Sequence, residues 1–140
     1  MSGRITPWIS RAVLLAALTV LAMISRKFIG HPVDAAAASN ITLGSKLAIT
    51  TMRASFGAFP LGCALFVLLC LVTSSLRKTG LVFVALIVGT ALAVRVFGVV
   101  ADGTLAESVH LIIPETVLLA LSLAAYVGER VSESSASRRA

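Results

Sequence analysis

Four long apolar segments are the feature that most constrains this chain. They cover residues 9–29, 54–76, 81–100 and 109–127, and few charged side chains interrupt them. A helix needs about 20 mainly apolar residues to cross a bilayer. With 58% hydrophobic and 13% charged residues in 140, the chain is too apolar for a water-soluble core of this size. We therefore expect an all-α fold, an integral membrane antiparallel four-helix bundle over residues 1–128.

The first segment also has a second interpretation. Residues 12–25 and the small residues 35–37 resemble the apolar part and the cleavage site of a secretory signal peptide. The basic pair Arg26-Lys27 follows the apolar stretch directly, which is unusual for such a peptide. We therefore expect this segment to remain as a membrane helix.

Local signals predict how the other segments begin and end. Pro60 and Gly62 predict a kink in the second segment. Residues 77–80 are the predicted link to the third segment, and so short a link makes the two helices antiparallel neighbours. Residues 129–140 contain Ser, Glu and Arg but a single Val, which predicts a disordered cytoplasmic tail.

The distribution of basic residues predicts the orientation in the membrane. Four spans place both termini on the same side as the link at residues 77–80. The basic residues of that side are Arg4, Arg11, Arg77, Lys78, Arg130, Arg138 and Arg139. Those of the other side are Arg26, Lys27, Lys46 and Arg53. Because cytoplasmic loops carry the excess of Lys and Arg, we expect a multi-pass protein of the bacterial cytoplasmic (inner) membrane with both termini in the cytoplasm.

Two ionisable residues, Arg95 and Glu115, interrupt the apolar segments. Counted from the inner ends at Leu81 and Val127, they lie about 21 Å and about 18 Å into the membrane at 1.5 Å per residue. Opposite charges at nearly equal depth on consecutive helices predict an ion pair, because neither charge is then buried alone. This pair can serve a purely structural purpose or form part of a ligand site, and the sequence leaves both open.

Three further polar residues belong to the same outer side and are candidates for the rim of a pocket. They are Arg53, Asp102 and His110. Two guanidinium groups in one pocket would suit an anionic or oxygen-rich ligand. Each residue also has a simpler interpretation: Arg53 as a headgroup anchor, Asp102 as part of an Asp-Gly turn, and His110 as an interfacial histidine.

Small residues at four-residue spacing mark one face of the third segment. Ala85, Gly89 and Ala93 form this face. Such faces allow close approach between membrane helices. They serve either internal packing or the docking of a membrane protein partner.

The positions of these polar residues resemble a known pattern. Residues 53–57 (RASFG), Arg95, Asp102-Gly103 and Glu115 resemble an uncharacterised family of bacterial four-helix membrane proteins within the wider DoxX-like group, over residues 10–127. The resemblance implies a four-helix membrane fold. Some DoxX-like relatives are similar to accessory subunits of membrane redox or stress-response systems.

The sequence favours a non-enzymatic function. It contains no motif of a phosphate-binding loop, zinc protease or serine hydrolase, so we predict no catalytic residue and no metal site, and no cofactor is indicated. The basic residues flank apolar segments rather than form a nucleic-acid-binding stripe. We expect an accessory or scaffold subunit in the lipid bilayer, or a binder of a small anionic or lipophilic ligand. The alternatives are a small transporter or channel subunit and a membrane enzyme acting on a lipid-like substrate.

Overall fold

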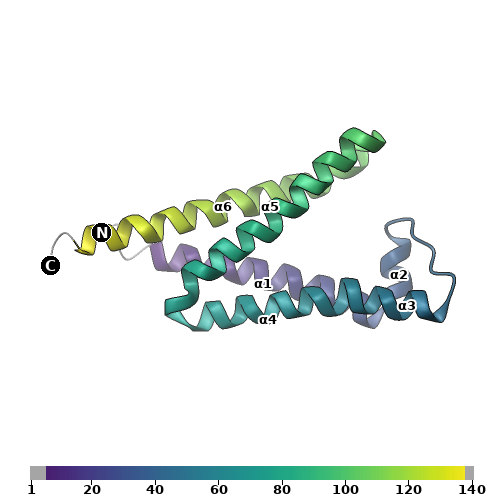
Figure 1. Ribbon diagram of the computed structural model, residues 1–140, viewed down its shortest axis with the longest axis horizontal. Coiled ribbons are helices and arrows are strands. Elements are labelled where there is room, and N and C mark those ends of the chain that lie inside the picture. The colour runs from purple at the N-terminus through teal and green to yellow at the C-terminus, as the bar shows by residue number, and fades with distance from the viewer. Residues whose placement is uncertain (1–5, 138–140) are drawn as a thin grey trace. The chain divides into compact units, whose positions relative to one another are not determined.

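The computed structural model describes residues 6–137, and every regular element in this range is helical (Figure 1). Four stretches are long and apolar enough to cross a membrane: Trp8–Gly30, Lys46–Val72, Ser74–Asp102 and Leu105–Ser132. This confirms the predicted all-α class with four membrane-spanning segments. Arg4, Arg138 and Arg139, which contributed to the predicted orientation, lie outside the described residues.

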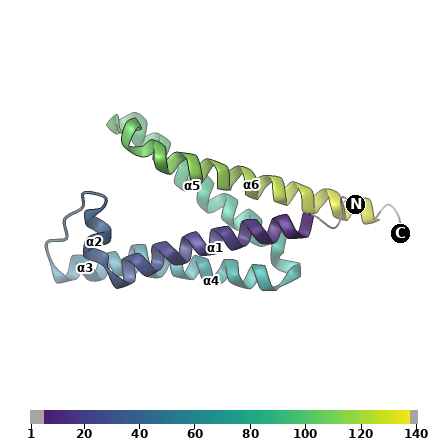
Figure 2. The ribbon, with the colours of Figure 1, turned by 180° about the vertical axis from the view of Figure 1, so that it is seen from behind.

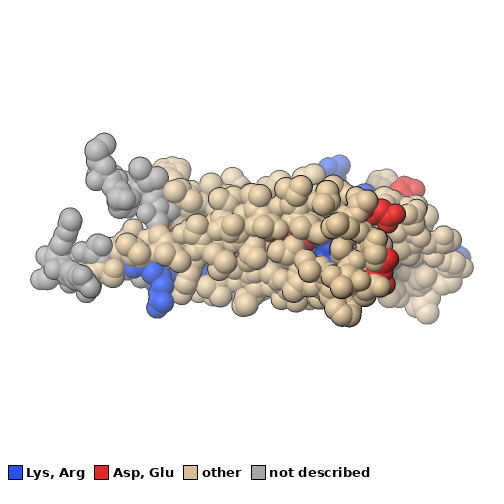
Figure 3. Space-filling model, turned by 90° about the horizontal axis from the view of Figure 1, so that it is seen from above, with Lys and Arg blue, Asp and Glu red and all other residues tan. Residues whose placement is uncertain are grey.

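The surface of the molecule is apolar, as a lipid environment requires. Figure 3 shows that uncharged side chains form most of the visible surface. Large apolar side chains such as Phe97 and Val100 are 73% and 80% exposed. In water such a surface would be an aggregation hazard, whereas in a bilayer it is solvated by acyl chains.

The chain divides into two compact units. One is Leu15–Leu69, and the other comprises Met1–Leu14 and Cys70–Ala140. Helices α1 (Thr6–Gly30) and α4 (Phe59–Val72) each contribute to both units.

In the unit Leu15–Leu69, α1 lies beside the helix formed by α3 (Lys46–Met52), η2 (Arg53–Ala58) and α4 (Figures 1 and 2). The short helix α2 (Pro32–Ala37) follows α1. The buried Ser25 hydroxyl donates a hydrogen bond to the carbonyl of Gly57 at 2.8 Å. The rings of Phe28 and Phe56 lie 5.4 Å apart. These contacts join the C-terminal half of α1 to the second span.

The second span begins earlier than predicted. We expected its start at residue 54, but α3 begins at Lys46 because the Ser45 side chain accepts a hydrogen bond from the N–H of Ala48. This is the arrangement of an N-cap, which satisfies one of the free donors at a helix start.

A π-helical turn stands just before Pro60, where we predicted a kink. The N–H of Phe59 bonds to the carbonyl of Ala54, five residues back. A proline ring clashes with the carbonyl four residues before it in a regular α-helix. The wider turn of η2 provides the room that this ring needs, since π-turns insert one extra residue into the helix.

In the other unit, α5 (Arg77–Asp102) and α6 (Leu105–Ser137) form an antiparallel hairpin (Figure 1). Gly103 ends α5 with a positive φ of 70°, and its N–H bonds to the carbonyl of Val99. The Asp102-Gly103 pair therefore forms the predicted turn, with glycine at the left-handed position that it occupies most readily.

The predicted link at residues 77–80 is wrong. The chain reverses at Thr73, which is extended, and through the short 3₁₀ helix η3 (Ser74–Leu76). Residues 77–80 are the first turn of α5 instead. Arg and Lys are good helix formers, and Gly80 is used for packing rather than for a turn.

Helix α6 also extends further than predicted. We expected disorder from Glu129 onward, but the helix continues to Ser137. Glu129 makes an ion pair with Arg77 of α5, which ties this part of the helix to the hairpin. Residues 138–140 lie outside the described residues.

Gly80 allows a close approach between helices. A Cβ atom at this position would lie 2.6 Å from the Cβ atom of Cys70 and 3.1 Å from a methyl group of Leu14. All three residues are buried. The Cβ atom of Cys70 is fixed to the backbone, so an added methyl group could be accommodated only by moving a helix.

We predict that Gly80→Ala lowers the free energy of unfolding by about 1–3 kcal/mol, the range for overpacking a close-packed interior. The control is Gly62→Ala in α4, where an added Cβ would have no neighbour within 4 Å. Because alanine has the higher helix propensity, this control should be neutral or stabilising. Thermal unfolding in detergent measures both variants, and equal melting temperatures for the two would contradict the packing role of Gly80.

Candidate functional site

The Arg95–Glu115 pair is the charged site expected inside the membrane. Arg95 Nε donates to one carboxylate oxygen of Glu115 at 3.0 Å, and a terminal nitrogen of Arg95 donates to the other at 2.7 Å. The bond is therefore bidentate, which is the strongest arrangement of these two groups. It joins α5 to α6, and both side chains keep part of their surface exposed, 30% for Arg95 and 22% for Glu115.

Glu115 lies well inside α6 despite its proline neighbour. Helix α6 begins at Leu105 and contains Pro114 in its interior. Glu115 therefore does not lie in the first turn of a helix, although a residue directly after a proline often does. Its carboxylate is held by an arginine rather than by a helix N-terminus.

A second ion pair, which sequence reasoning missed, closes the other end of the hairpin. A terminal nitrogen of Arg77 lies 3.4 Å from a carboxylate oxygen of Glu129. Both side chains are well buried, with exposed fractions of 10% and 13%. We had placed Arg77 in a loop and Glu129 in a disordered tail, so their pairing was not predicted.

The spacing of the four charged residues contains a signal for both pairs. Arg77 and Arg95 are 18 residues apart, about five helical turns, so they lie on the same face of α5. Glu115 and Glu129 are 14 residues apart, about four turns, and share a face of α6. The rise between the two arginines is about 27 Å, close to the thickness of the hydrocarbon core.

Arg77 is incompletely satisfied in its pair. A guanidinium group has five N–H donors, and the buried Nε of Arg77 has no hydrogen-bond acceptor among the described residues. A buried donor without an acceptor costs about 1–3 kcal/mol. The Arg77–Glu129 pair therefore leaves one N–H donor of Arg77 without an acceptor.

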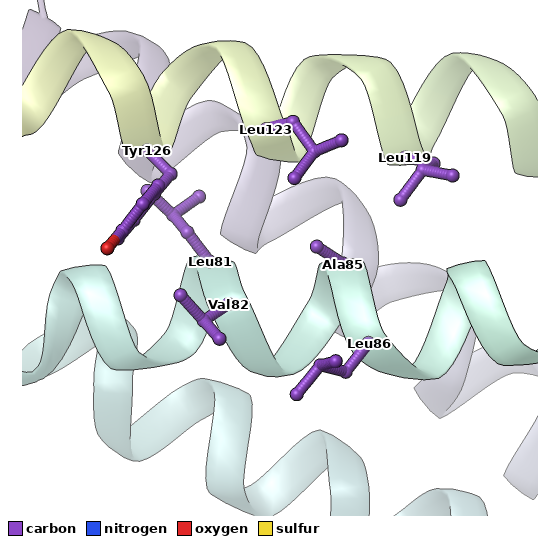
Figure 4. Close-up of a pocket in the computed structure, with 7 residues that line it drawn as sticks. All are labelled: Leu81, Val82, Ala85, Leu86, Leu119, Leu123 and Tyr126. Carbon is purple, nitrogen blue, oxygen red and sulfur yellow. The ribbon is translucent and has the colours of Figure 1, made fainter.

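An apolar groove runs along the hairpin between the two ion pairs (Figure 4). It has a volume of about 360 Å³ and lies between α5 and α6. Its lining residues are Leu81, Val82, Ala85, Leu86, Leu119, Leu123 and Tyr126. Tyr126 carries the single side-chain oxygen among them. It lies at one end of the groove (Figure 4) and is three residues before Glu129 in the sequence. We call this feature the α5–α6 groove.

The three predicted rim residues have separate surroundings. Nε of Arg53 donates to the carbonyl of Ile29 at 3.2 Å, within the unit Leu15–Leu69. Asp102 and His110 are exposed, and neither is hydrogen-bonded to the Arg95–Glu115 pair in the described part of the chain. Asp102 is seven residues beyond Arg95, about 10 Å along α5. A shared pocket of Arg53 with these residues stays a prediction.

The small-residue face is divided between two environments. Ala85 lines the α5–α6 groove. A Cβ atom on Gly89 would lie 3.6 Å from Leu119 of α6, so Gly89 faces the hairpin partner. Ala93 is exposed. Only Gly89 of the three is thus shown to pack within the hairpin, and a protein partner on this face stays a prediction.

Within residues 6–137, no cluster of three or more His, Cys, Asp or Glu side chains could hold a metal ion. Cys63 and Cys70 are buried free thiols.

No protein-family model, curated protein or solved structure matches this chain. The resemblance to the DoxX-like group therefore stays a prediction, and the hairpin itself is the basis for a functional proposal. Chemically, the hairpin offers an apolar groove bounded by two arginine–carboxylate pairs.

We predict that Glu115→Ala destabilises the protein by about 1–3 kcal/mol or more, because it leaves the Arg95 guanidinium inside the membrane without its acceptor. The double variant Arg95→Met/Glu115→Leu should recover most of this loss, since apolar side chains replace both charges. Glu107→Ala is the matched control, because Glu107 is an exposed carboxylate in the first turn of the same helix. Thermal unfolding in detergent checks all three variants, and a double variant as unstable as Glu115→Ala would show that the pair does more than hold the hairpin.

Proposed function

We propose that this protein is a non-enzymatic accessory or scaffold subunit of a membrane, and that it acts by binding a lipophilic ligand or a membrane partner at the α5–α6 hairpin. The observation that carries the proposal is the α5–α6 groove, which is apolar and lies between two ion pairs that tie its walls together. Helices joined at both ends keep their separation, and preorganised walls lower the cost of binding.

The use of the charged groups supports binding over catalysis. A general acid or base needs a proton-transfer group poised for the reaction. Both oxygens of Glu115 accept hydrogen bonds from Arg95, so this pairing uses the carboxylate for holding α5 and α6 together.

The proposed location is the bacterial cytoplasmic membrane, with both termini in the cytoplasm. Arg77, Lys78 and Arg130 lie at the end of the hairpin that this orientation places inside, together with Arg11 of α1. An excess of basic residues on the cytoplasmic side supports this orientation. The resemblance to the DoxX-like group is compatible with an accessory role, and we propose it as the family relationship.

A transporter or channel subunit is the second candidate function. It is favoured by the partial exposure of the Arg95 and Glu115 side chains, because intramembrane ionisable residues often line substrate or proton paths.

Native mass spectrometry after gentle extraction from the membrane tests the binding function. We expect the wild type to carry a lipophilic molecule or a membrane protein in a fixed ratio. Leu86→Trp, which places a large ring in the groove, should abolish this binding. Val94→Trp is the matched control, because Leu86 and Val94 are both 65% exposed on α5 and only Leu86 lines the groove.

Reconstitution into liposomes tests the second candidate. Ion current or solute uptake that Glu115→Gln abolishes would contradict the accessory role and support transport.

The proposed orientation predicts the signal of topology reporters. A reporter fused after Ala140 should give a cytoplasmic signal, and one inserted after Gly44 should give a periplasmic signal, because an odd number of spans separates the two sites. Paired phosphatase and fluorescent-protein fusions measure this. The opposite pair of signals would reverse the orientation of the whole hairpin.

A further inference from the structure

We propose that the α5–α6 groove is a site for an anionic phospholipid of the cytoplasmic leaflet, with one acyl chain in the groove and the headgroup phosphate bound at Arg130 and Tyr126. The proposal rests on the proposed binding function and orientation, and it identifies the chemistry of the ligand.

The walls of the groove suit an acyl chain. Six of the seven lining residues carry purely aliphatic side chains, and Tyr126 provides the single hydroxyl. From Leu119 to Tyr126 the groove follows seven residues of α6, about 10 Å at 1.5 Å per residue. This is enough for part of one acyl chain running parallel to the helices, the direction that chains take in a leaflet.

The inner end of the groove changes from apolar to basic over one helical turn. Arg77 precedes the lining residue Leu81 by four residues, and Arg130 follows Tyr126 by four. Residues four apart lie on the same face of a helix. The guanidinium of Arg130 lies over the Tyr126 ring, 5.8 Å from its centre. The Tyr126 ring and the Arg130 guanidinium therefore lie together at the end of the groove where we place the lipid headgroup.

The charge at this end favours an anion. Among the described side chains, Glu129 is a carboxylate in contact with a hairpin arginine, Arg77. That ion pair cancels its own charge. The same end carries two further basic residues, Lys78 and Arg130, against one further acidic residue, Glu133, so its balance by sequence is positive. A lipid with a net negative headgroup complements this charge, whereas a zwitterionic headgroup brings its own cation.

The state of Arg77 is an independent indication of a missing acceptor. Its residue surface is 8% exposed, and its Nε has no acceptor among the described residues. The bond to Glu129, at 3.4 Å, is long for a charge-assisted hydrogen bond. The Arg77–Glu129 pair at the basic end of the groove is therefore not a fully satisfied one.

The test is a titration of the delipidated full-length protein in detergent with two lipids of identical acyl chains, phosphatidylglycerol and phosphatidylcholine. Native mass spectrometry counts the bound lipids and gives an apparent affinity for each. We expect the wild type to prefer phosphatidylglycerol by about fivefold, the contribution of one basic residue near an anionic headgroup.

Arg130→Gln should lower the affinity for phosphatidylglycerol more than that for phosphatidylcholine, so that the preference is lost. Arg11→Gln is the matched control, because Arg11 makes the same type of contact, 5.5 Å from the ring centre of Trp8, and neither residue lines the groove. It should retain the preference. Melting curves confirm that both variants are folded.

The groove variants separate this inference from the proposed function. Leu86→Trp should weaken the binding of both lipids, and Val94→Trp should leave both unchanged. Equal affinities of the wild type for the two lipids, or an unchanged preference in Arg130→Gln, would overturn the anionic-lipid site. If Leu86→Trp nevertheless abolished lipid binding, the groove would still be a binding site and the proposed function would stand.

Discussion

A charge inside a bilayer must have a partner of opposite charge, and the α5–α6 hairpin depends on this constraint. Each of the two arginines of α5 meets a glutamate of α6, Arg95 with Glu115 and Arg77 with Glu129. A register shift of either helix would separate both pairs, leaving four ionisable groups in an apolar environment. The pairs therefore fix the alignment of α5 with α6, and this alignment determines the shape of the α5–α6 groove.

Close packing adds a second constraint, because lipid gives membrane helices little hydrophobic reason to associate. Gly80 lies against Cys70 and Leu14, and Gly57 accepts a hydrogen bond from Ser25 while its Cα faces Ile29. At both glycines the lack of a side chain lets backbones approach and makes room for specific contacts. The association of these helices is thus determined by shape and by single hydrogen bonds, each within its own unit.

The ion pairs and the groove are the structural basis of the proposed binding function. Its strongest polar interactions hold α5 and α6 together. The α5–α6 groove between these helices is apolar and has a basic end. A rigid groove of this kind can hold one lipid or one partner helix in a fixed position. The function that we propose on this basis is to place a neighbour in the membrane.

The sequence by itself determined the fold class and the first ion pair. Four apolar segments require helices because backbone polar groups have no water to bind in lipid, and the equal depths of Arg95 and Glu115 follow from counting residues along straight helices. Only the tertiary structure decided where the hairpin begins and what closes it. The sequence around Arg77 is typical of a loop, and the sequence around Glu129 is typical of a disordered tail. Local composition shows that these residues are polar, but it does not show which residues they contact. Their pairing depends on where the chain reverses before α5, which is at Thr73 and η3 rather than at the polar residues 77–80.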